Sequence, residues 1–337
     1  MTIFSTISSE SDDLCFTSFH GTLRIMQPPS RWVVTGGAGF LATNFLHALR
    51  PEDGDVVAID RRAPRWPVTR PGIRYLERDV REVESYRREI VPGSVVVHMA
   101  SCSYPGKAED RIESDIQDNV LGTVRLAQAC ADVGARALLF LSSGGTVYGD
   151  QPLSPLPEDA PTRPVSAYGA MKIAIEHYLH VIHHLRGLPV ACLRPSNPFG
   201  PWHEGAGQGA INVFFAKLLK GEEIEIWGDG SQVRDFIPVE DVASAIRSIG
   251  LSFTEGSDTF NIGTGFGRTV TDVLAEAERL TGITANARRF PARPVDVTSN
   301  VLDIRKMKER FGWEPAVPFD DAMRRTSEWV RSQAGPA

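Results

Sequence analysis

The fold is decided by one stretch, Trp32-Val33-Val34-Thr35-Gly36-Gly37-Ala38-Gly39-Phe40-Leu41-Ala42. Its first four residues predict a short strand, and the residues from Phe40 onward predict the start of a helix. Glycines at positions 36 and 39 allow a sharp turn and let a diphosphate reach backbone N–H groups at the helix N-terminus. A strand, a glycine turn and a helix in this order predict the first unit of a dinucleotide-binding fold. We expect Gly36, Gly39, Phe40 and Leu41 to border the cofactor.

An acidic residue, Asp60, follows about twenty residues later at the end of a second predicted strand. A carboxylate at this place accepts hydrogen bonds from the adenosine ribose and disfavours a 2′-phosphate. The prediction is therefore NAD rather than NADP. Arg61 and Arg62 come directly afterward, so NADP stays open as the alternative.

Apolar strands alternate with helical stretches from residue 31 onward. Continuous Val/Ile/Leu runs indicate strands that are covered on both faces, and the alternation indicates a parallel sheet. We predict an α/β fold, a doubly wound parallel sheet (Rossmann) with a smaller C-terminal α/β region for the substrate. The expected strands are Trp32–Thr35, Asp55–Ile59, Ile73–Leu76, Val95–Met99, Leu138–Leu141 and Val190–Leu193, and the expected helices are Phe40–Leu49, Arg81–Glu89, Ile112–Val133 and Ala167–Leu185.

The division into domains follows from the same pattern. Residues 1–30 are expected to form a flexible N-terminal extension, with Met26 as a candidate alternative start. Residues 31–195 are expected to form the NAD-binding domain, with part of 233–262 returning to it. Residues 196–334 are expected to form mainly the substrate domain.

Composition excludes several classes of protein. A formal net charge of −6 is unfavourable for binding a nucleic-acid backbone, and no apolar run approaches the length of a membrane span. Four cysteines lie far apart without a CxxC pair, which indicates neither a disulfide framework nor a zinc site. His180 and His184 have the spacing of a metal pair, but no third ligand is suggested and we expect no metal. A cytoplasmic enzyme is the expectation.

The second chemical signal is the pair Tyr168 and Lys172 on a predicted helix. Four-residue spacing places the phenol and the ammonium on one face, one turn apart. A free tyrosine is a poor base at neutral pH, and a nearby cation stabilises the phenolate. Next to a dinucleotide turn, this pair indicates a tyrosine base.

With these residues the chain resembles the extended short-chain dehydrogenase/reductases, in particular the NAD-dependent nucleotide-sugar epimerases and dehydratases. The resemblance covers about residues 31 to 330. It rests on the glycine turn and Asp60, together with the following blocks: Asp79-Val80, His98-Met99-Ala100, Asn119–Thr123, Ser142–Gly149, Tyr168-x-x-x-Lys172, Leu193–Pro201, Gly228–Gly230 with Arg234–Phe236, and Arg293–Asp296.

The resemblance implies a role for each matching residue. Tyr168 is implied to be the catalytic base, and Lys172 to hold the nicotinamide ribose. The other implied cofactor contacts are Asp79 and Val80 at the adenine, with Met99, Ala100, Ser101, Asn119, Ser142 and Pro195. The implied contacts to a nucleotide-diphosphate sugar are Asn197, Trp227, Arg234, Arg293, Asp296 and Asn300, and Arg194 is a third candidate for the diphosphate. A homodimer through the helices at 112–133 and 168–185 is also implied.

The loop after the fifth strand departs from the family pattern. Relatives carry Ser or Thr where this chain has Gly144, so Ser143 or Thr146 must supply the missing hydroxyl, and we favour Ser143. In 4,6-dehydratases this residue is followed by an Asp-Glu pair, whereas here Gly145 and Thr146 follow, which favours epimerisation at C4. Asn300 matches a position that separates hexoses from N-acetylhexosamines and is intermediate in size. A 4-keto-sugar reductase, a dehydratase and a catalytically silent NAD(P)-binding protein remain as alternatives.

Overall fold

The computed structural model describes residues 28–103, 108–110, 112–203, 209–293 and 296–333. The expected N-terminal extension lies almost wholly outside these residues, as do Pro294 and Val295 of one motif. At the first described residues, Ser30 already donates a backbone hydrogen bond to Gly93 at 3.2 Å.

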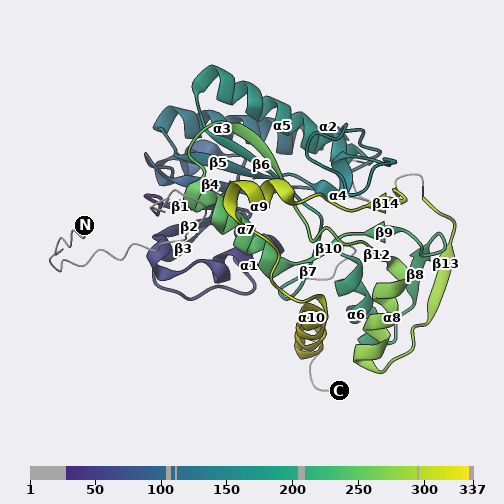
Figure 1. Cartoon of the computed structure of the whole chain (residues 1–337). Coiled ribbons are helices and arrows are strands. Elements are labelled where there is room, and N and C mark those ends of the chain that lie inside the picture. Colours follow the sequence, from purple (N-terminus) through teal and green to yellow (C-terminus); the bar gives the residue numbers. More distant parts are fainter. Residues whose placement is uncertain (1–27, 104–107, 111, 204–208, 294–295, 334–337) are drawn as a thin grey trace, which may run out of the picture.

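A parallel sheet of seven strands forms the centre of the molecule (Figure 1). Its order is β11-β6-β5-β4-β1-β2-β3, with all neighbours parallel. This confirms the doubly wound architecture, because β1 lies inside the sheet and the chain runs outward from it in both directions. The strands are β1 Trp32–Thr35, β2 Val56–Asp60, β3 Ile73–Glu77, β4 Val95–His98, β5 Ala137–Leu141, β6 Val190–Pro195 and β11 Ser257–Ile262.

Helices cover both faces of the sheet. Consecutive residues of β1 show the two sides, since Val33 belongs to the core beneath α3 (Gly122–Val133) and α5 (Ala167–Arg186). Val34 belongs to the opposite core, which is covered by α1 (Phe40–Ala48), α7 (Val239–Ser252) and α9 (Arg305–Phe311). Side chains alternate between faces along a strand, which explains the continuous apolar runs in the sequence.

Two of the expected helices differ in the structure. Arg81–Glu89 forms two short 3₁₀ turns, Val83–Ser85 and Arg87–Glu89, instead of an α-helix. Tyr86 leaves the helical conformation between them, with φ −132°, and its buried ring places the hydroxyl 2.7 Å from the Val80 carbonyl. The expected helix at 112–133 divides into α2 (Ile112–Asp115), a π-helical turn at Ile116–Leu121, and α3.

The C-terminal half forms a separate apolar core. It is built around Phe215, Phe236 and Met323, and Figure 1 shows α6, α8 and α10 gathered away from the large sheet. β11 returns from this half to the sheet and pairs with β6, and α7 packs on α1. The remaining α-helices and strands are α4 Gly144–Val147, β7 Asn197–Phe199, α6 Ala210–Lys220, β8 Ile224–Trp227, β9 Val233–Arg234, β10 Phe236–Pro238, β12 Arg268–Thr269, α8 Val270–Thr281, β13 Ala287–Phe290, β14 Ser299–Asn300 and α10 Phe319–Gln333.

Across the described part of the chain, none of the helices combines the length and the apolar character needed to span a bilayer.

Candidate active site

The glycine turn joins β1 to α1 at the carboxyl edge of the sheet. Gly36 has φ +73°, and a Cβ atom there would lie 2.7 Å from the backbone nitrogen of Ala100. Gly39 is the N-cap residue of α1, and no side chain there accepts a hydrogen bond from the N–H groups of the first turn. The N–H groups of a first helical turn have no partner within the helix, and Gly36 leaves no room for a side chain beside them, so they form a cradle for an anionic group. The cradle fits the diphosphate of a dinucleotide.

Asp60 ends β2 beside this turn. Its carboxylate accepts hydrogen bonds from the backbone N–H groups of Ala38 at 3.2 Å and Arg62 at 3.0 Å, which fixes its direction. Arg61 is exposed. This is the place expected for an acidic residue that binds the adenosine ribose.

Asp79 is held by an arginine that the sequence did not assign. Arg81 donates to the Asp79 carboxylate through Nε at 3.0 Å and Nη2 at 2.7 Å, and also reaches Asp118 at 2.9 Å. The hydrogen bonds from Arg81 lower the pKa of Asp79. Asp79 is therefore a fixed negative charge, and with the neighbouring Val80 it stands at the end of β3 where the adenine is expected.

The loop after β4 is tied to the π-helical turn. Asn119 lies in that turn, is 7% exposed, and accepts a hydrogen bond from the Cys102 backbone at 2.8 Å. The Asn119 Nδ2 atom is buried without a hydrogen-bond partner, as is the hydroxyl of Ser103. Buried polar atoms are rarely left unpaired, so these two donors mark a place for a bound polar group. Met99, Ala100 and Ser101 are the residues of this loop that come before Cys102.

Tyr168 and Lys172 lie one turn apart at the start of α5. The Lys172 side chain is 3% exposed and donates through Nζ to the carbonyl of Leu141 at 2.7 Å, while Nζ lies 5.5 Å from the centroid of the Tyr168 ring. Burial lowers the pKa of Lys172 to about 8. Burial, and secondarily the charge of Asp115, raises the pKa of Tyr168. The described residues alone thus keep Tyr168 protonated, and a further positive charge is needed to make it a base.

Gly144 has no space for a side chain. A Cβ atom at this position would lie 2.5 Å from Leu302 Cδ1 and 2.8 Å from the Arg194 carbonyl. At Gly145 the nearest atom would lie 3.6 Å away, which is ordinary contact. The departure from the family pattern at Gly144 is therefore a packing requirement of this chain, because α4 lies directly on Leu302 and on the end of β6.

The two candidate replacements for that hydroxyl differ in their surroundings. Ser143 caps α4 at its N-terminus, and its side chain makes no capping hydrogen bond. The Thr146 hydroxyl is buried and has no hydrogen-bond partner. The sequence favoured Ser143 as the source of the hydroxyl. The structure favours Thr146, because a buried hydroxyl without a hydrogen-bond partner is costly unless a bound molecule supplies one.

Ser142 and Arg194 turn away from the expected ligands. Arg194 is 5% exposed and binds Glu176 through two nitrogens, at 3.0 and 2.6 Å, so the expectation that it gathers a diphosphate is wrong. The Ser142 hydroxyl also donates to Glu176, and Arg194 reaches Tyr148 at 2.9 Å. This buried network supports the back of the loop that carries Ser143 and Gly144. Because the Ser142 hydroxyl donates its proton to Glu176, it is left to face a cofactor as a hydrogen-bond acceptor.

The expected substrate residues gather on the small sheets of the C-terminal half. The Arg293 guanidinium lies 5.1 Å from the Trp227 ring centroid. Its Nε and Nη2 atoms each donate a hydrogen bond of 2.8 Å to the Asp296 carboxylate. Arg234 on β9 pairs in register with Asn300 on β14. Burial lowers the pKa of Arg234, and the negative charge of Asp296 offsets only part of this effect. One guanidinium on an aromatic ring, that of Arg293, with a second guanidinium, that of Arg234, within electrostatic reach of it, suits a nucleoside diphosphate.

Asn300 and Asn197 connect this group to the catalytic loop. Asn300 is 1% exposed and donates through Nδ2 to the Gly144 carbonyl at 3.0 Å, and its Oδ1 has no partner. Asn197 on β7 lies beside Gly145, whose Cβ would meet the Asn197 amide at 3.6 Å. Pro195, at the buried end of β6, lies behind Gly144. The structure therefore brings the catalytic and the substrate residues to one region.

Two residues of this region were missed from the sequence. Asp115 is 3% exposed, and neither of its carboxylate oxygens has a hydrogen-bond partner. It precedes Asn119 by four residues, and Glu176 follows Lys172 by four. This spacing places each beside a residue that had been recognised and is the signal that would have found them.

Comparisons with known proteins point to one family of enzymes. The family model described as "NAD dependent epimerase/dehydratase family" matches residues 32–263. A UDP-glucose 4-epimerase of Mycolicibacterium smegmatis is 31% identical over 90% of this chain and 99% of its own. A dTDP-glucose 4,6-dehydratase of Xanthomonas campestris is 30% identical over 88% and 92%. The crystal structure of the UDP-glucose 4-epimerase of Thermotoga maritima with UDP-glucose is 30% identical, with a TM-score of 0.83, over 90% of this chain and 99% of that one.

Proposed function

The chain belongs to the NAD-dependent epimerase/dehydratase family, and we propose that it inverts C4 of a nucleotide sugar through transient oxidation to the 4-keto sugar. The substrate is a UDP-hexose or a UDP-N-acetylhexosamine. The observation that carries this proposal is the Tyr168–Lys172 pair beside a loop whose residues 143 to 147 bear no carboxylate.

When bound, NAD supplies reversible oxidation of the sugar at C4. Tyr168 accepts the proton of the sugar 4-hydroxyl. It later returns a proton to the same oxygen, after the keto sugar has turned its other face toward the place of oxidation. Lys172 supports the phenolate with its charge, because its nitrogen is fixed by the Leu141 carbonyl within 5.5 Å of the phenol ring centroid. The residues that would hold the cofactor are those of the glycine turn, Asp60, Asp79 and Asn119.

Dehydration needs an acid and a base at sugar C5 and C6 in addition to this pair. The loop offers Gly145 and Thr146 where dehydratases carry their carboxylates. Asp115 is the buried acidic group that acts on Tyr168, and it lies on another segment, at the end of α2. Among the residues that the structure describes, Asp115 is the carboxylate that acts on Tyr168, and one such group does not supply both steps, so epimerisation is the reaction that the site supports best.

Inversion at C4 also requires the keto sugar to turn over while its nucleotide stays bound. Arg234, Arg293 and Trp227 suit this role, since they hold the diphosphate and base far from the reacting carbon. Asn300 is fixed by the Gly144 carbonyl, so it forms a rigid wall against which the sugar turns.

The test is to incubate the purified protein with UDP-glucose and, separately, UDP-N-acetylglucosamine, and to follow the C4-inverted product by NMR. We expect product without added cofactor and none with Tyr168→Phe. A reductase would instead consume NADPH in a 1:1 ratio, and a dehydratase would release a product lighter by one water in mass spectrometry. Absence of any product from both sugars, with Tyr168→Phe indistinguishable from wild type, would overturn the proposal for these substrates.

We further propose a homodimer through α5 and the α2–α3 segment. Tyr178, Val181 and Leu185 lie on one stripe of α5 and are 52%, 47% and 70% exposed. Ile112 and Ile116, in and just after α2, are each 53% exposed. Large apolar side chains gathered on neighbouring helices are typical of a surface that is covered by a partner.

A further inference from the structure

Three side chains on one face of α1 contact three consecutive residues of the segment that follows β7. Phe40, Asn44 and His47 share this face because they are spaced by four and three residues. We call these contacts the α1 latch: the Phe40 and His203 rings are 4.7 Å apart between centroids, Asn44 Nδ2 donates to the Pro201 carbonyl at 3.1 Å, and the His47 and Trp202 rings stack at 4.2 Å with an interplanar angle of 11°.

The segment is fixed on its other side at Gly200. Asn212 on α6 donates to the Gly200 carbonyl at 2.8 Å and accepts from its N–H at 3.3 Å. A Cβ atom at Gly200 would lie 2.4 Å from Val239 at the start of α7, so the backbone is pressed against that helix. Residues 201–203 therefore span from a fixed point near α6 and α7 to the face of α1.

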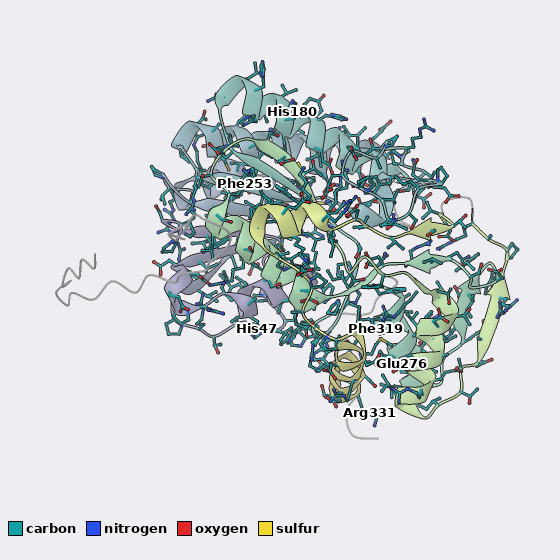
Figure 2. All side chains as sticks on the ribbon, viewed as in Figure 1. His47, His180, Phe253, Glu276, Phe319 and Arg331 are labelled. Carbon is teal, nitrogen blue, oxygen red and sulfur yellow. The ribbon has the colours of Figure 1, made fainter. Side chains whose placement is uncertain are left out.

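Trp202 adopts a backbone conformation that residues other than glycine rarely take. Its φ of +62° is the one positive value among the non-glycine residues of the described chain. Such a backbone conformation persists where its surroundings stabilise it. Here the His47 ring, stacked on the Trp202 ring, stabilises this conformation. Figure 2 shows that His47 lies on the side of the large sheet opposite α5.

The two ends of the latch belong to the two binding regions. Phe40 is the first residue of α1, directly after the glycine turn that receives the dinucleotide diphosphate. Asn197 lies three residues before Gly200, in the strand expected to reach the substrate. We propose that the α1 latch retains the cofactor, with His47 and Trp202 as positioning residues that hold the segment after β7 against the cofactor-binding helix. This inference rests on NAD binding at the turn and not on the reaction at C4.

The experiment measures NAD dissociation from the purified protein, independently of turnover. NAD-loaded wild type, Trp202→Ala and His47→Ala are diluted into a dehydrogenase assay that captures released NAD. We expect release to be about tenfold faster in both variants, because each loses the same ring stack. Trp202→Phe keeps a ring and should release NAD at close to the wild-type rate.

The matched control is Trp66→Ala, which removes another aromatic pair, with Trp329 at 5.4 Å, that includes none of the residues of the α1 latch. It should leave the release rate unchanged. Since His47 is exposed, its substitution cannot empty the core, and thermal unfolding verifies that each variant is folded. Equal release rates in His47→Ala and wild type, or an equal acceleration in Trp66→Ala, would overturn the proposal. Absence of C4 inversion with normal NAD retention would instead speak against the proposed reaction alone.

Discussion

The ammonium nitrogen of Lys172 lies 5.5 Å from the centroid of the Tyr168 ring and is tied to the Leu141 carbonyl at 2.7 Å. The tie comes from β5, whereas both side chains come from α5, so sheet and helix together set the distance. Burial lowers the pKa of Lys172 to about 8 and raises the pKa of Tyr168. The phenol alone therefore stays protonated, and its use as a base depends on positive charge beside it.

Lys172→Met should lower kcat at pH 7 by about 10² or more, the usual effect of removing one positioned group that stabilises charge during the reaction. Without the cation the pKa of Tyr168 rises further, so the remaining activity should increase more steeply with pH than in wild type. A pH–rate profile of both proteins, each saturated with NAD, is the measurement. Parallel profiles would show that Lys172 acts only through cofactor binding.

Gly144 and Gly145 form a matched pair for testing the packing of α4. Gly144→Ala should lower the free energy of unfolding by about 1–3 kcal/mol, because its Cβ would overlap Leu302 and a backbone carbonyl. Gly145→Ala should cost less, since its nearest neighbour would be 3.6 Å away. Urea unfolding measures both. Equal losses would mean that helix α4 moves to admit either side chain, and Gly144→Ser would then be expected to fold and to be active.

The hydroxyl that replaces the one missing at Gly144 can be identified with two variants. Thr146→Val keeps the shape of the side chain and removes a buried hydroxyl that has no partner in the protein. We expect it to lower kcat by about 10² and to leave stability nearly unchanged, whereas Ser143→Ala should have the smaller effect on kcat. Steady-state kinetics decide, and a larger loss in Ser143→Ala would restore the assignment made from the sequence.

Local patterns predicted the fold and much of the site because each depends on residues that are close in the chain. The turn at Gly36–Gly39, the pair on α5 and the sheet strands all follow from short spacings. Arg194 was misassigned because its partner, Glu176, lies on another element. The packing at Gly144 was also invisible, since Leu302 approaches it from the far end of the sequence. A side chain's partner across the fold is not encoded in local spacing.

His98 gives a prediction for stability in acid. It is buried between the hydroxyls of Thr35 at 2.6 Å and Thr123 at 2.8 Å, and burial lowers its pKa to about 3. The unfolded chain binds this proton near pH 6.5 and the folded chain does not, so its contribution is complete above pH 6.5 and is lost as pH falls toward 3. The slope is at most about 1.4 kcal/mol per pH unit. Urea unfolding of wild type and His98→Gln between pH 4 and 7 should show a shallower loss in the variant. Parallel curves would place the acid sensitivity elsewhere.

The apolar stripe on α5 predicts the oligomeric state. Leu185 is 70% exposed in the single chain. If a second subunit covers it, the substitution Leu185→Glu places a carboxylate in the interface without a partner. We expect this variant to be a monomer at micromolar concentration, where wild type is a dimer, with size-exclusion chromatography and light scattering as the measurement. Phe266→Glu is the matched control, because Phe266 is equally exposed, at 72%, but lies in a loop before β12. It should remain dimeric. A monomeric wild type, or equal dissociation in both variants, would show that the stripe on α5 is not the contact between subunits.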